Sequence, residues 1–494
     1  MYRGAPYLFE NRYQIRGTLT TLSPLHVGDG DTIGFHNRNE GTNPQDDPEC
    51  NSMCANHLGK AMIPGSSLKG VLRAWAHQQG ISSAILDALF GIKDSGGKVR
   101  YNDCFLIEPA PGKNDDRWWH PGRGTCLAPG VSLNPKTRTA AEHLLYYTEF
   151  APEQSKFEVV LTAQDLSVEE LGTLLAIMKS GFGPGRETIA IGAETADGWG
   201  KCEFKQNSVE LIEASDVSEW LKNPIAKCKG RSVTPAIPAL PAAARPRVYL
   251  DIELTFEGGM LVNDPSQFRK RNETQGVEDV GHASIKRRDG SYFLPSSSVR
   301  GALRGQARRI WQTLANGTAK EVPEKVPEIK NRRELKDLHA FFRMVGAPGW
   351  RTPLEIPDFK IDGNGKLEKQ EFVAIDRFMG GAADDKKFSA TALWRPKMSG
   401  RIVIDLAMWQ RAQVTDWAWM LLLFTLRDLV EGDVYFGFGR SKGYGKCTAK
   451  VTASAVGGGE TVVDVSLLND VLSRRDLSSP ILEQWHAELS ALVQ

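Results

Sequence analysis

Two cysteines and a histidine lie close together in the first part of the chain. Cys50, Cys54 and His57 form a Cys-x₃-Cys-x₂-His pattern. Thiolates and imidazole are zinc ligands, and a bound metal can order a loop that is too polar to pack. A fourth ligand would come from elsewhere in the chain: Cys104, Cys126 or His120. The pattern therefore predicts a structural Zn²⁺ site, with a set of free thiols as the alternative.

Serines and cations occur together at the start of two predicted helices, in the segments IPGSSLKGVLR (63–73) and LPSSSVRGALR (294–304). Backbone N–H groups at a helix N-terminus favour a phosphate, and cations four residues apart share one helix face. One such segment alone would be a solvated basic face with an ordinary serine cap, but its recurrence favours phosphate binding. The residues expected to cap these helices or to contact phosphates are Ser66, Ser67, Lys69, Arg73, Ser297, Ser298, Arg300 and Arg304.

A third pattern interleaves glycines with cations in the segment FGFGRSKGYGKC (436–447), which contains Arg440 and Lys442. Glycine lets a ligand approach the backbone closely, cations suit phosphates, and the Tyr444 ring could stack on a base. The matching segment IGAETADGWGKC (191–202) is less basic and has Trp199 at the tyrosine position. A flexible hairpin is the alternative for such a segment, and the less basic copy could be purely structural.

The helix-start and glycine-rich patterns belong to an internal repeat whose order is kept along the chain. The matching pairs are 25–28 with 260–263, 63–73 with 294–304, 131–140 with 373–382, and 191–202 with 436–447, at offsets of 235, 231, 242 and 245 residues. Chance could supply one pair but hardly all of them in order, which indicates a tandem duplication. We expect a first domain at 1–231, a Pro- and Ala-rich linker at 232–246 and a second domain at 247–494.

Hydrophobic periodicity predicts the elements that must position these residues. Each half starts with alternating apolar and polar residues, typical of a strand, and continues with a helix whose buried face includes Leu68 and Leu72 in the first copy. A later helix precedes the glycine-rich segment, which runs into a closing strand. The predicted strands are 13–20, 201–204, 248–255 and 446–451, and the later helices are 168–180 and 416–431. This order predicts an α+β fold of two tandem ferredoxin-like domains.

Composition limits the possible functions. The chain has 494 residues, of which 41% are hydrophobic and 24% charged, which excludes wholesale disorder and a coiled coil. Its 61 basic and 60 acidic residues leave a formal charge of +1, so any nucleic-acid binding must use local patches. Seven cysteines do not suggest a disulfide framework, and the strongest apolar stretch, 417–424, is far shorter than the roughly 20 residues a bilayer needs. We expect a cytoplasmic protein without a membrane segment.

The motifs together resemble the repeat-associated mysterious protein (RAMP) superfamily. The resemblance rests on IPGSSLKGVLR, LPSSSVRGALR, GFGRSKGYGKC and IDRFMGGA, and it touches both halves of the chain. The combination is similar to backbone subunits of type III CRISPR effector complexes, so the chain resembles a fusion of two such subunits. The resemblance implies modified RNA-recognition-motif folds with inserted loops and thumb hairpins, which polymerise along a guide RNA and disrupt the guide–target duplex at six-nucleotide intervals.

The implied partners are the guide RNA, a complementary target RNA and other CRISPR effector subunits. The cations of the repeated motifs, together with Arg377 in IDRFMGGA, are then the expected RNA-binding residues. The resemblance also implies an aspartate, in the loop before each Pro-Ser segment, that cuts the target RNA with Mg²⁺ or another divalent cation. Such a cation retains waters and needs only one or two carboxylates beside phosphate.

The family's spacing places the first acid within about two residues of Asp47 and Glu49, with Asp46 beside them. In the second loop Asp279 is the expected residue, but no aspartate matches the first loop in register. The second site is therefore displaced or inactive.

Three functions stay open: a metal-dependent endoribonuclease that cuts target RNA, a non-catalytic backbone subunit that binds guide RNA, and a metal-independent guide-processing ribonuclease with a histidine general base. The acidic first loop favours the first function over the third. The out-of-register acids of the second loop keep the non-catalytic function open for the second domain. We expect His26, near the end of the first strand, to be an ordinary structural or exposed histidine.

Overall fold

Contacts divide the chain, represented here by a computed structural model, into two compact units. Unit 1 consists of Met1–Asn134, Thr139–Thr195 and Trp199–Ala244, and unit 2 of Pro135–Arg138, Ala196–Gly198 and Arg245–Gln494. The residues that the structure describes are 10–35, 49–110, 118–133, 140–183, 188–220, 222, 230–240, 246–263, 282–284, 290–456, 464–473 and 479–494.

Unit 1 is built on an antiparallel sheet in the order β12-β11-β1-β10-β6-β4, with β5 paired to β10. Its central strand β1 (Asn11–Thr21) buries alternate side chains, as the period of its sequence predicts. The order β11-β1-β10-β6 is that of a ferredoxin-like fold. The other strands are β4 (Met62–Ile63), β5 (Val99–Tyr101), β6 (Cys104–Glu108), β10 (Lys156–Gln164), β11 (Cys202–Glu213) and β12 (Arg231–Ser232).

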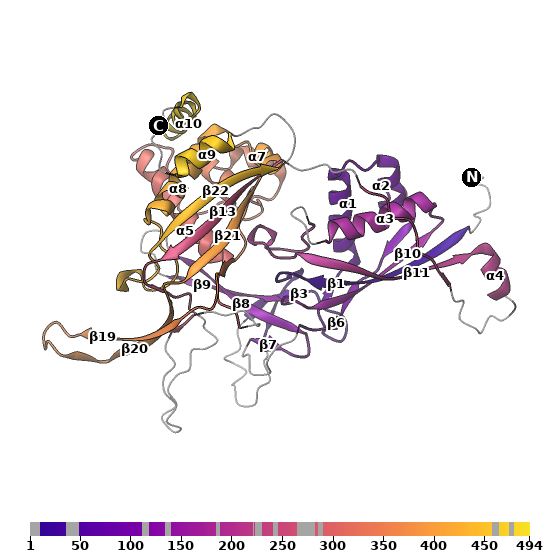
Figure 1. The fold of residues 1–494 in the computed structure, drawn as a ribbon, viewed down its shortest axis with the longest axis horizontal. Coiled ribbons are helices and arrows are strands. Elements are labelled where there is room, and N and C mark those ends of the chain that lie inside the picture. Colours follow the sequence, from indigo (N-terminus) through magenta and orange to yellow (C-terminus); the bar gives the residue numbers. More distant parts are fainter. Residues whose placement is uncertain are drawn as a thin grey trace, which may run out of the picture. The chain divides into compact units, whose positions relative to one another are not determined.

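Helices α1 (Gly65–Gln78), α2 (Ser83–Phe90) and α3 (Val168–Gly181) gather on one face of this sheet (Figure 1). Leu68 and Leu72 of α1 are completely buried in the core beneath them, which confirms the predicted buried face. The short helix α4 (Ala214–Trp220) follows β11. The predicted helix 168–180 is therefore present, whereas the closing strand is longer than the predicted 201–204.

Two insertions of unit 1 form a second sheet in the order β2-β3-β9-β8-β7. One insertion follows β1 and the other lies between β6 and β10. Their strands are β2 (Gly28–Gly34), β3 (Glu49–Met53), β7 (Trp119–His120), β8 (Thr125–Leu133) and β9 (Ala140–Phe150). Strand β3 of this sheet contains Glu49, one of the expected catalytic acids, and Cys50, one of the expected zinc ligands.

The described part of the Pro- and Ala-rich segment packs on unit 1. The N–H group of Val233 donates to the carbonyl oxygen of Val209 at 2.9 Å. Val233 and Leu240 lie against the main core, and a Cβ atom at Gly172 of α3 would come within 2.6 Å of the Ala236 carbonyl oxygen. Residues 233–240 therefore contact unit 1 at Val233, Ala236 and Leu240, although most of them are exposed.

Unit 2 repeats the same sheet order as β16-β18-β21-β13-β22, with β17 paired to β21. Its strands are β13 (Arg247–Phe256), β16 (Phe293–Leu294), β17 (Leu354–Glu355), β18 (Phe359–Ile361), β21 (Lys397–Asp405) and β22 (Cys447–Val456). Its helices are α5 (Ser296–Leu314), α6 (Ala340–Val345), α7 (Leu406–Arg411), α8 (Asp416–Glu431), α9 (Val465–Leu472) and α10 (Pro480–Val493). The predicted helix 416–431 is confirmed, and its apolar residues enter the core of unit 2.

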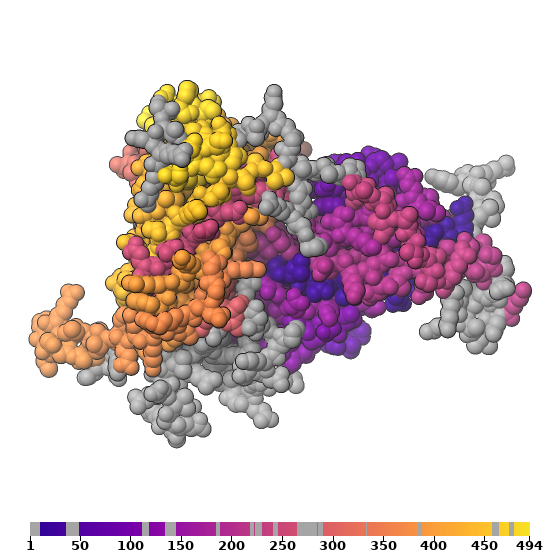
Figure 2. Space-filling model, in the orientation of Figure 1, coloured from indigo at the N-terminus to yellow at the C-terminus, as the bar shows by residue number. Residues whose placement is uncertain are grey.

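A long hairpin of β19 (Leu367–Ile375) and β20 (Ala382–Trp394) extends from unit 2 (Figures 1 and 2). Its base is joined to the rest of the unit by β14 (Gly259–Met260) and β15 (His282–Ala283), which both pair with β20. The hairpin occupies the same place in the repeat as β8 and β9 of unit 1. The matching segments 131–140 and 373–382 thus start in β8 and β19 and end at the first residues of β9 and β20.

Candidate nucleic-acid interface

Helices α1 and α5 both begin after a proline, as expected, but their serines do not cap them. No side-chain cap hydrogen bond is formed at Pro64 or Pro295. Instead, the N–H group of Gly65 donates to Asp103 Oδ1 at 2.8 Å, and that of Ser296 donates to Asp358 Oδ1 at 2.7 Å. The prediction of serine caps is wrong because the N-cap residues are Pro64 and Pro295. An aspartate just before β6 or β18 accepts from the first free N–H group of each helix.

The two capping aspartates were missed in the sequence, although a signal for them exists. Asp103 directly precedes β6 and Asp358 directly precedes β18, and these strands are equivalent in the repeat. Each aspartate therefore recurs with the duplication. Ser66 and Ser297 are exposed, and Ser67 and Ser298 are half-buried, so all four lie beside a helix N-terminus whose first donor is already used.

The four cations of α1 and α5 differ in burial and in ion pairing, and so in how readily they could contact a phosphate. Arg300 Nε donates to Asp197 Oδ1 at 2.5 Å, and Arg300 Nη2 donates to the Ala196 carbonyl oxygen at 2.6 Å. Arg304 lies 5.6 Å from the centre of the Phe342 ring, and burial, with the charges of neighbouring arginines, lowers its pKa. Arg73 is exposed and 3.7 Å from Asp87, whereas Lys69 is half-buried. Arg300 is thus committed to an internal ion pair.

The glycine-rich loop of unit 2 (residues 437–445) presents two exposed cations. Residues Arg440–Lys442 form a short 3₁₀ turn, η5, between Gly439 and Gly443, which adopt φ values of 87° and 82° that favour glycine. Arg440 lies 4.2 Å from the centre of the Tyr435 ring, and Lys442 lies 5.4 Å from that of Phe388 and 5.3 Å from that of Phe438. Within the described residues neither cation has a carboxylate partner. Aromatic faces hold both side chains while their N–H groups stay exposed.

Tyr444 and Trp199, the two aromatic residues expected to stack on a base, both make contacts inside the protein. Tyr444 is only 3% exposed, and its hydroxyl donates to Gln370 Oε1 at 2.5 Å. Trp199 is half-buried, and its ring lies 5.2 Å from the ring of Phe150 in β9. The expected stacking role of Tyr444 is therefore wrong, because the sequence did not reveal that the inserted hairpin covers it.

The end of the β19–β20 hairpin exposes apolar side chains on an ordered turn. Asp376 Oδ1 accepts hydrogen bonds from the N–H groups of Phe378 at 2.7 Å and Met379 at 2.9 Å. These two backbone donors lower the pKa of Asp376. Phe378 and Met379 are almost fully exposed, Ile375 is two-thirds exposed, and Arg377 lies exposed beside them. The turn thus presents an apolar tip with one cation.

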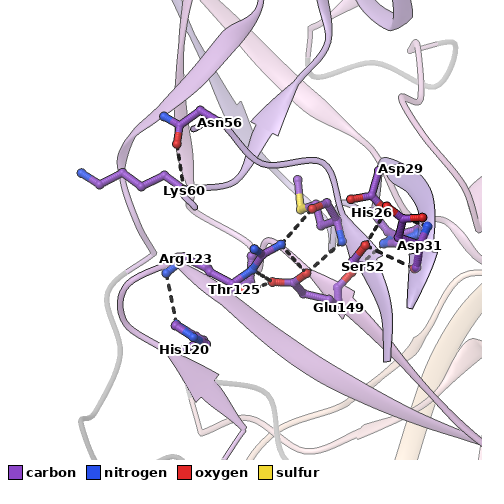
Figure 3. A network of polar contacts seen from close by, with 11 residues as sticks. His26, Asp29, Asp31, Ser52, Asn56, Lys60, His120, Arg123, Thr125 and Glu149 are labelled. Carbon is purple, nitrogen blue, oxygen red and sulfur yellow. Dashed lines mark hydrogen bonds and ion pairs between the residues drawn. The ribbon is translucent and has the colours of Figure 1, made fainter. Parts of the chain in front are cut away.

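The second sheet of unit 1 is held by a buried ion pair (Figure 3). Glu149 is fully buried, and its two oxygens accept hydrogen bonds from Arg123 at 2.5 and 2.9 Å and from the Thr125 hydroxyl at 2.6 Å. Burial acts to lower the pKa of Arg123, but the hydrogen bonds and charge of Glu149 outweigh it, so the pKa is raised. The Met53 N–H group donates to Glu149 Oε2 at 2.8 Å, and Arg123 Nη2 donates to the Met53 carbonyl oxygen at 2.9 Å. The pair therefore clamps the end of β3.

A second group of polar side chains lies beside Glu149, on the side away from Arg123 (Figure 3). It consists of His26, Asp29 and Asp31, with Ser52 of β3. His26 is 7% exposed, and its Nδ1 atom lies 2.6 Å from the Glu149 carbonyl oxygen, so it is a structural histidine. The Ser52 hydroxyl donates to Asp29 Oδ1, as does the N–H group of Asp31 at 3.0 Å. Burial acts to raise the pKa of Asp29, but these donors outweigh it and lower the pKa.

One of the four expected catalytic acids can be placed. Glu49 is the first residue of β3, is exposed, and pairs with Gly34 of β2. Asp46, Asp47 and Asp279 lie outside the described residues. Glu49 stands four residues before Met53, so the Glu149–Arg123 clamp fixes the strand that carries it.

The three expected zinc ligands do not come together. Cys50 packs with Phe35 and Leu127, Cys54 packs against the main core of unit 1, and His57 is exposed. Burial raises the pKa of the Cys50 thiol to about 12 and also raises that of Cys54. Over the described ranges, no three His, Cys, Asp or Glu side chains are grouped closely enough to hold a metal ion. The Zn²⁺ site remains a prediction without an assembled ligand set.

Comparison with known proteins identifies the family. The model of the RAMP superfamily matches residues 18–203 and 280–448, which is more than half of the chain and includes one region in each repeat. The chain belongs to the RAMP superfamily, as a fusion of two RAMP domains, and this membership indicates a CRISPR-associated, RNA-binding role. A search of curated proteins finds no match. None of the described helices is both long and apolar enough to cross a membrane.

Proposed function

We propose that this protein is a guide-RNA-binding backbone subunit of a type III CRISPR effector, and that it cuts bound complementary target RNA at six-nucleotide spacing with a divalent cation. Its proposed partners are the guide RNA, the target RNA and other effector subunits. The observation that carries the proposal is the glycine-rich loop of unit 2, where Arg440 and Lys442 are exposed, held by aromatic rings and not neutralised by a carboxylate in the described residues.

Such a loop suits a phosphate backbone. Cations that already lie over aromatic rings lose little conformational freedom on binding, and no internal ion pair has to be broken first. The open glycine backbone allows close approach of a polyanion. Phosphate contacts of this kind carry no sequence information, as a subunit that accepts any guide requires.

The β19–β20 hairpin supports the duplex-disrupting part of the proposal. Its tip holds Ile375, Phe378 and Met379 in water on a turn that Asp376 fixes. Apolar side chains that wedge between base steps unstack and kink a duplex. The exposed Arg377 beside them would contact a phosphate of the same duplex.

The cleavage part rests on the acidic first loop. The exposed carboxylate of Glu49 is an oxygen ligand of the kind that Mg²⁺ takes, and the phosphate of the RNA would supply further oxygens. The role of the chain's own residues is then to hold this carboxylate beside a bent RNA strand. The alternatives are a non-catalytic backbone subunit and a metal-independent guide-processing ribonuclease. One cleavage assay distinguishes both of them from the proposal.

The binding experiment compares the wild-type protein with the double variant Arg440→Ala and Lys442→Ala in a filter-binding titration with unrelated RNA sequences. Each lost phosphate contact should lower the slope of log K against log salt by about 0.7 to 1, so the double variant should lower it by up to about 2. Arg427→Ala is the matched control, because Arg427 is an exposed arginine of the same unit paired with Glu431. An unchanged slope in the double variant contradicts the proposed loop.

The cleavage experiment follows a labelled target RNA bound to the guide complex, with and without EDTA. The proposal expects cuts at six-nucleotide spacing that EDTA abolishes. Intact target in both lanes indicates a non-catalytic backbone subunit. Cleavage of the guide precursor that persists in EDTA indicates the metal-independent ribonuclease.

A further inference from the structure

The glycine-rich loop of unit 2 is joined to the inserted hairpin through Tyr444. The Tyr444 hydroxyl donates to Gln370 Oε1 of β19 at 2.5 Å, and its ring lies edge-on to that of Phe372, with the ring centres 6.0 Å apart. The same ring packs with Leu261, Ala390 and Ala392 in a small buried cluster. A residue of the loop therefore forms part of the base of the hairpin.

Lys442 joins the same loop to the other strand of the hairpin. Its ammonium group lies over Phe388 of β20, while Tyr444, two residues later, contacts β19. Phe388 and Phe372 are paired across the two strands, and their rings stack with centres 5.1 Å apart. The exposed Lys442 and the buried Tyr444 thus contact the same aromatic pair, Phe372 and Phe388.

The close fit around Tyr444 makes this joint stiff. A Cβ atom at Gly259 would come within 2.8 Å of the Tyr444 ring, and one at Gly439 within 3.1 Å. The ring therefore fills the space between the loop and β14, the strand that anchors β20. A shift of the loop must move Tyr444, because little free space surrounds it.

The contact recurs in the other copy of the repeat. Trp199 occupies the position of Tyr444 in the glycine-rich loop of unit 1, and its ring lies 5.2 Å from that of Phe150 in β9, a strand of the equivalent hairpin. The first glycine-rich segment, 191–202, has Thr195 and Asp197 where the second has Arg440 and Lys442. An aromatic contact with the hairpin is thus kept where the cations are not, which separates it from phosphate binding itself.

We infer that Tyr444 is a positioning residue that couples anion binding at the glycine-rich loop to the order of the β19–β20 hairpin. The inference rests on the proposed function, in that the anion is taken to be an RNA backbone. A phosphate held by Arg440 and Lys442 restrains the loop, and Tyr444 and Lys442 pass this restraint to β19 and β20. The hairpin that meets the duplex is therefore set in place when the guide is bound.

The test measures amide hydrogen exchange of hairpin peptides 367–375 and 388–394 in the full-length protein, with and without single-stranded oligouridylate. RNA should slow exchange in the wild type. Tyr444→Phe keeps the ring but loses the hydrogen bond to Gln370, so exchange in the free protein should rise about fivefold and the response to RNA should shrink. Its affinity for oligouridylate should fall by no more than about fivefold, because both cations remain and only the reciprocal effect of hairpin order on binding is lost.

Gln370→Met removes the same hydrogen bond from the hairpin side and tests the inference even if the tyrosine variant fails to fold. The single variants and the double variant should show the same rise in exchange, because all three lose one bond. A wild-type hairpin that does not respond to bound RNA, or responds equally in the variants, overturns the inference and leaves the proposed function standing. Failure of the wild type to bind oligouridylate overturns both.

Discussion

Glu149 is a buried carboxylate whose charge is balanced by Arg123, and this pair determines how firmly β3 is held. Arg123→Met would leave the carboxylate buried without its cation, so we expect the free energy of unfolding of unit 1 to fall by about 3–5 kcal/mol. The loss is measured by urea unfolding of the full chain, in which hydrogen exchange of unit 1 peptides reports the unfolding of unit 1.

Arg16→Met is the matched control for this prediction. Arg16 pairs with Glu158 in the same unit, but both side chains are more than one-third exposed, so water screens the pair. Its loss should cost no more than about 1 kcal/mol. A loss of similar size in the two variants would show that the buried pair has no special role.

Cys50 and Cys54 should react at different rates with iodoacetamide in the native protein. Only the thiolate reacts, and burial that raises the Cys50 pKa to about 12 leaves almost no thiolate at neutral pH. Cys54 is partly exposed, so it should be labelled first, and Cys54→Ser should remove that fast reaction. If zinc holds both residues, as their spacing predicts, both would resist labelling until a chelator is added, and metal analysis would find about one zinc per chain.

At the level of single residues, the sequence predicted local features but not the contacts between residues far apart in the chain. Spacing located the glycine-rich loop and its exposed cations, because glycine and charge act locally. It did not reveal that Tyr444 bonds Gln370, that Arg300 pairs with Asp197 or that Asp103 caps α1, since each partner lies 38 to 103 residues away. Such contacts depend on which strands the fold brings together, and residue spacing along the chain does not record this.

The strands and helices were predicted more fully than their contacts. The alternation that predicted 13–20 and 248–255 gave β1 and β13, and the helices 168–180 and 416–431 became α3 and α8. Burial of one face enforces these periods, so they appear in the sequence. The second sheet of unit 1 was not predicted, because its strands are exposed on several positions and show no clean alternation.

The turn at the end of the β19–β20 hairpin should depend on Asp376. Asp376→Ala removes the acceptor for two backbone N–H groups, so amide exchange at Phe378 and Met379 should rise, while Asp376→Asn retains an acceptor and should change it little. Equal exchange in the alanine variant and the wild type would mean that the β19–β20 ladder alone orders the turn.

The same turn should be sensitive to acid. The pKa of Asp376 is lowered from the ordinary value of 3.8, so the carboxylate stabilises the turn above that value, and this contribution is lost as the pH falls through the lowered pKa. Exchange at the tip, corrected for the intrinsic effect of pH, should therefore rise below about pH 4 in the wild type but not in Asp376→Asn. A parallel rise in both proteins would point to general acid unfolding.

The duplication gives one chain two copies of the same scaffold with different local chemistry. Both sheets share one strand order and both hairpins arise at the same place, but Arg440 and Lys442 occur only in the loop of unit 2. Shared core residues preserve the fold, whereas loop residues are free to diverge. Guide contacts at the glycine-rich loops should therefore be stronger in unit 2, while the acidic loop favours cleavage at unit 1.

This asymmetry gives a prediction for the pattern of cuts in a bound target RNA. Under the proposed function, the two hairpins of the chain would bend the RNA at two positions six nucleotides apart, where a carboxylate would act. The triple variant Asp46→Asn, Asp47→Asn and Glu49→Gln removes the negative charge of the first loop, so one band should disappear from a sequencing gel while guide and target binding persist. Asp279→Asn should remove a second band only if the second site is active, and EDTA should remove every band.

Asp31→Asn is the control for this prediction, because Asp31 is an exposed acid of the adjacent strand β2. If the triple variant leaves the bands of the wild type unchanged, the first loop holds no catalytic acid and unit 1 serves as a scaffold.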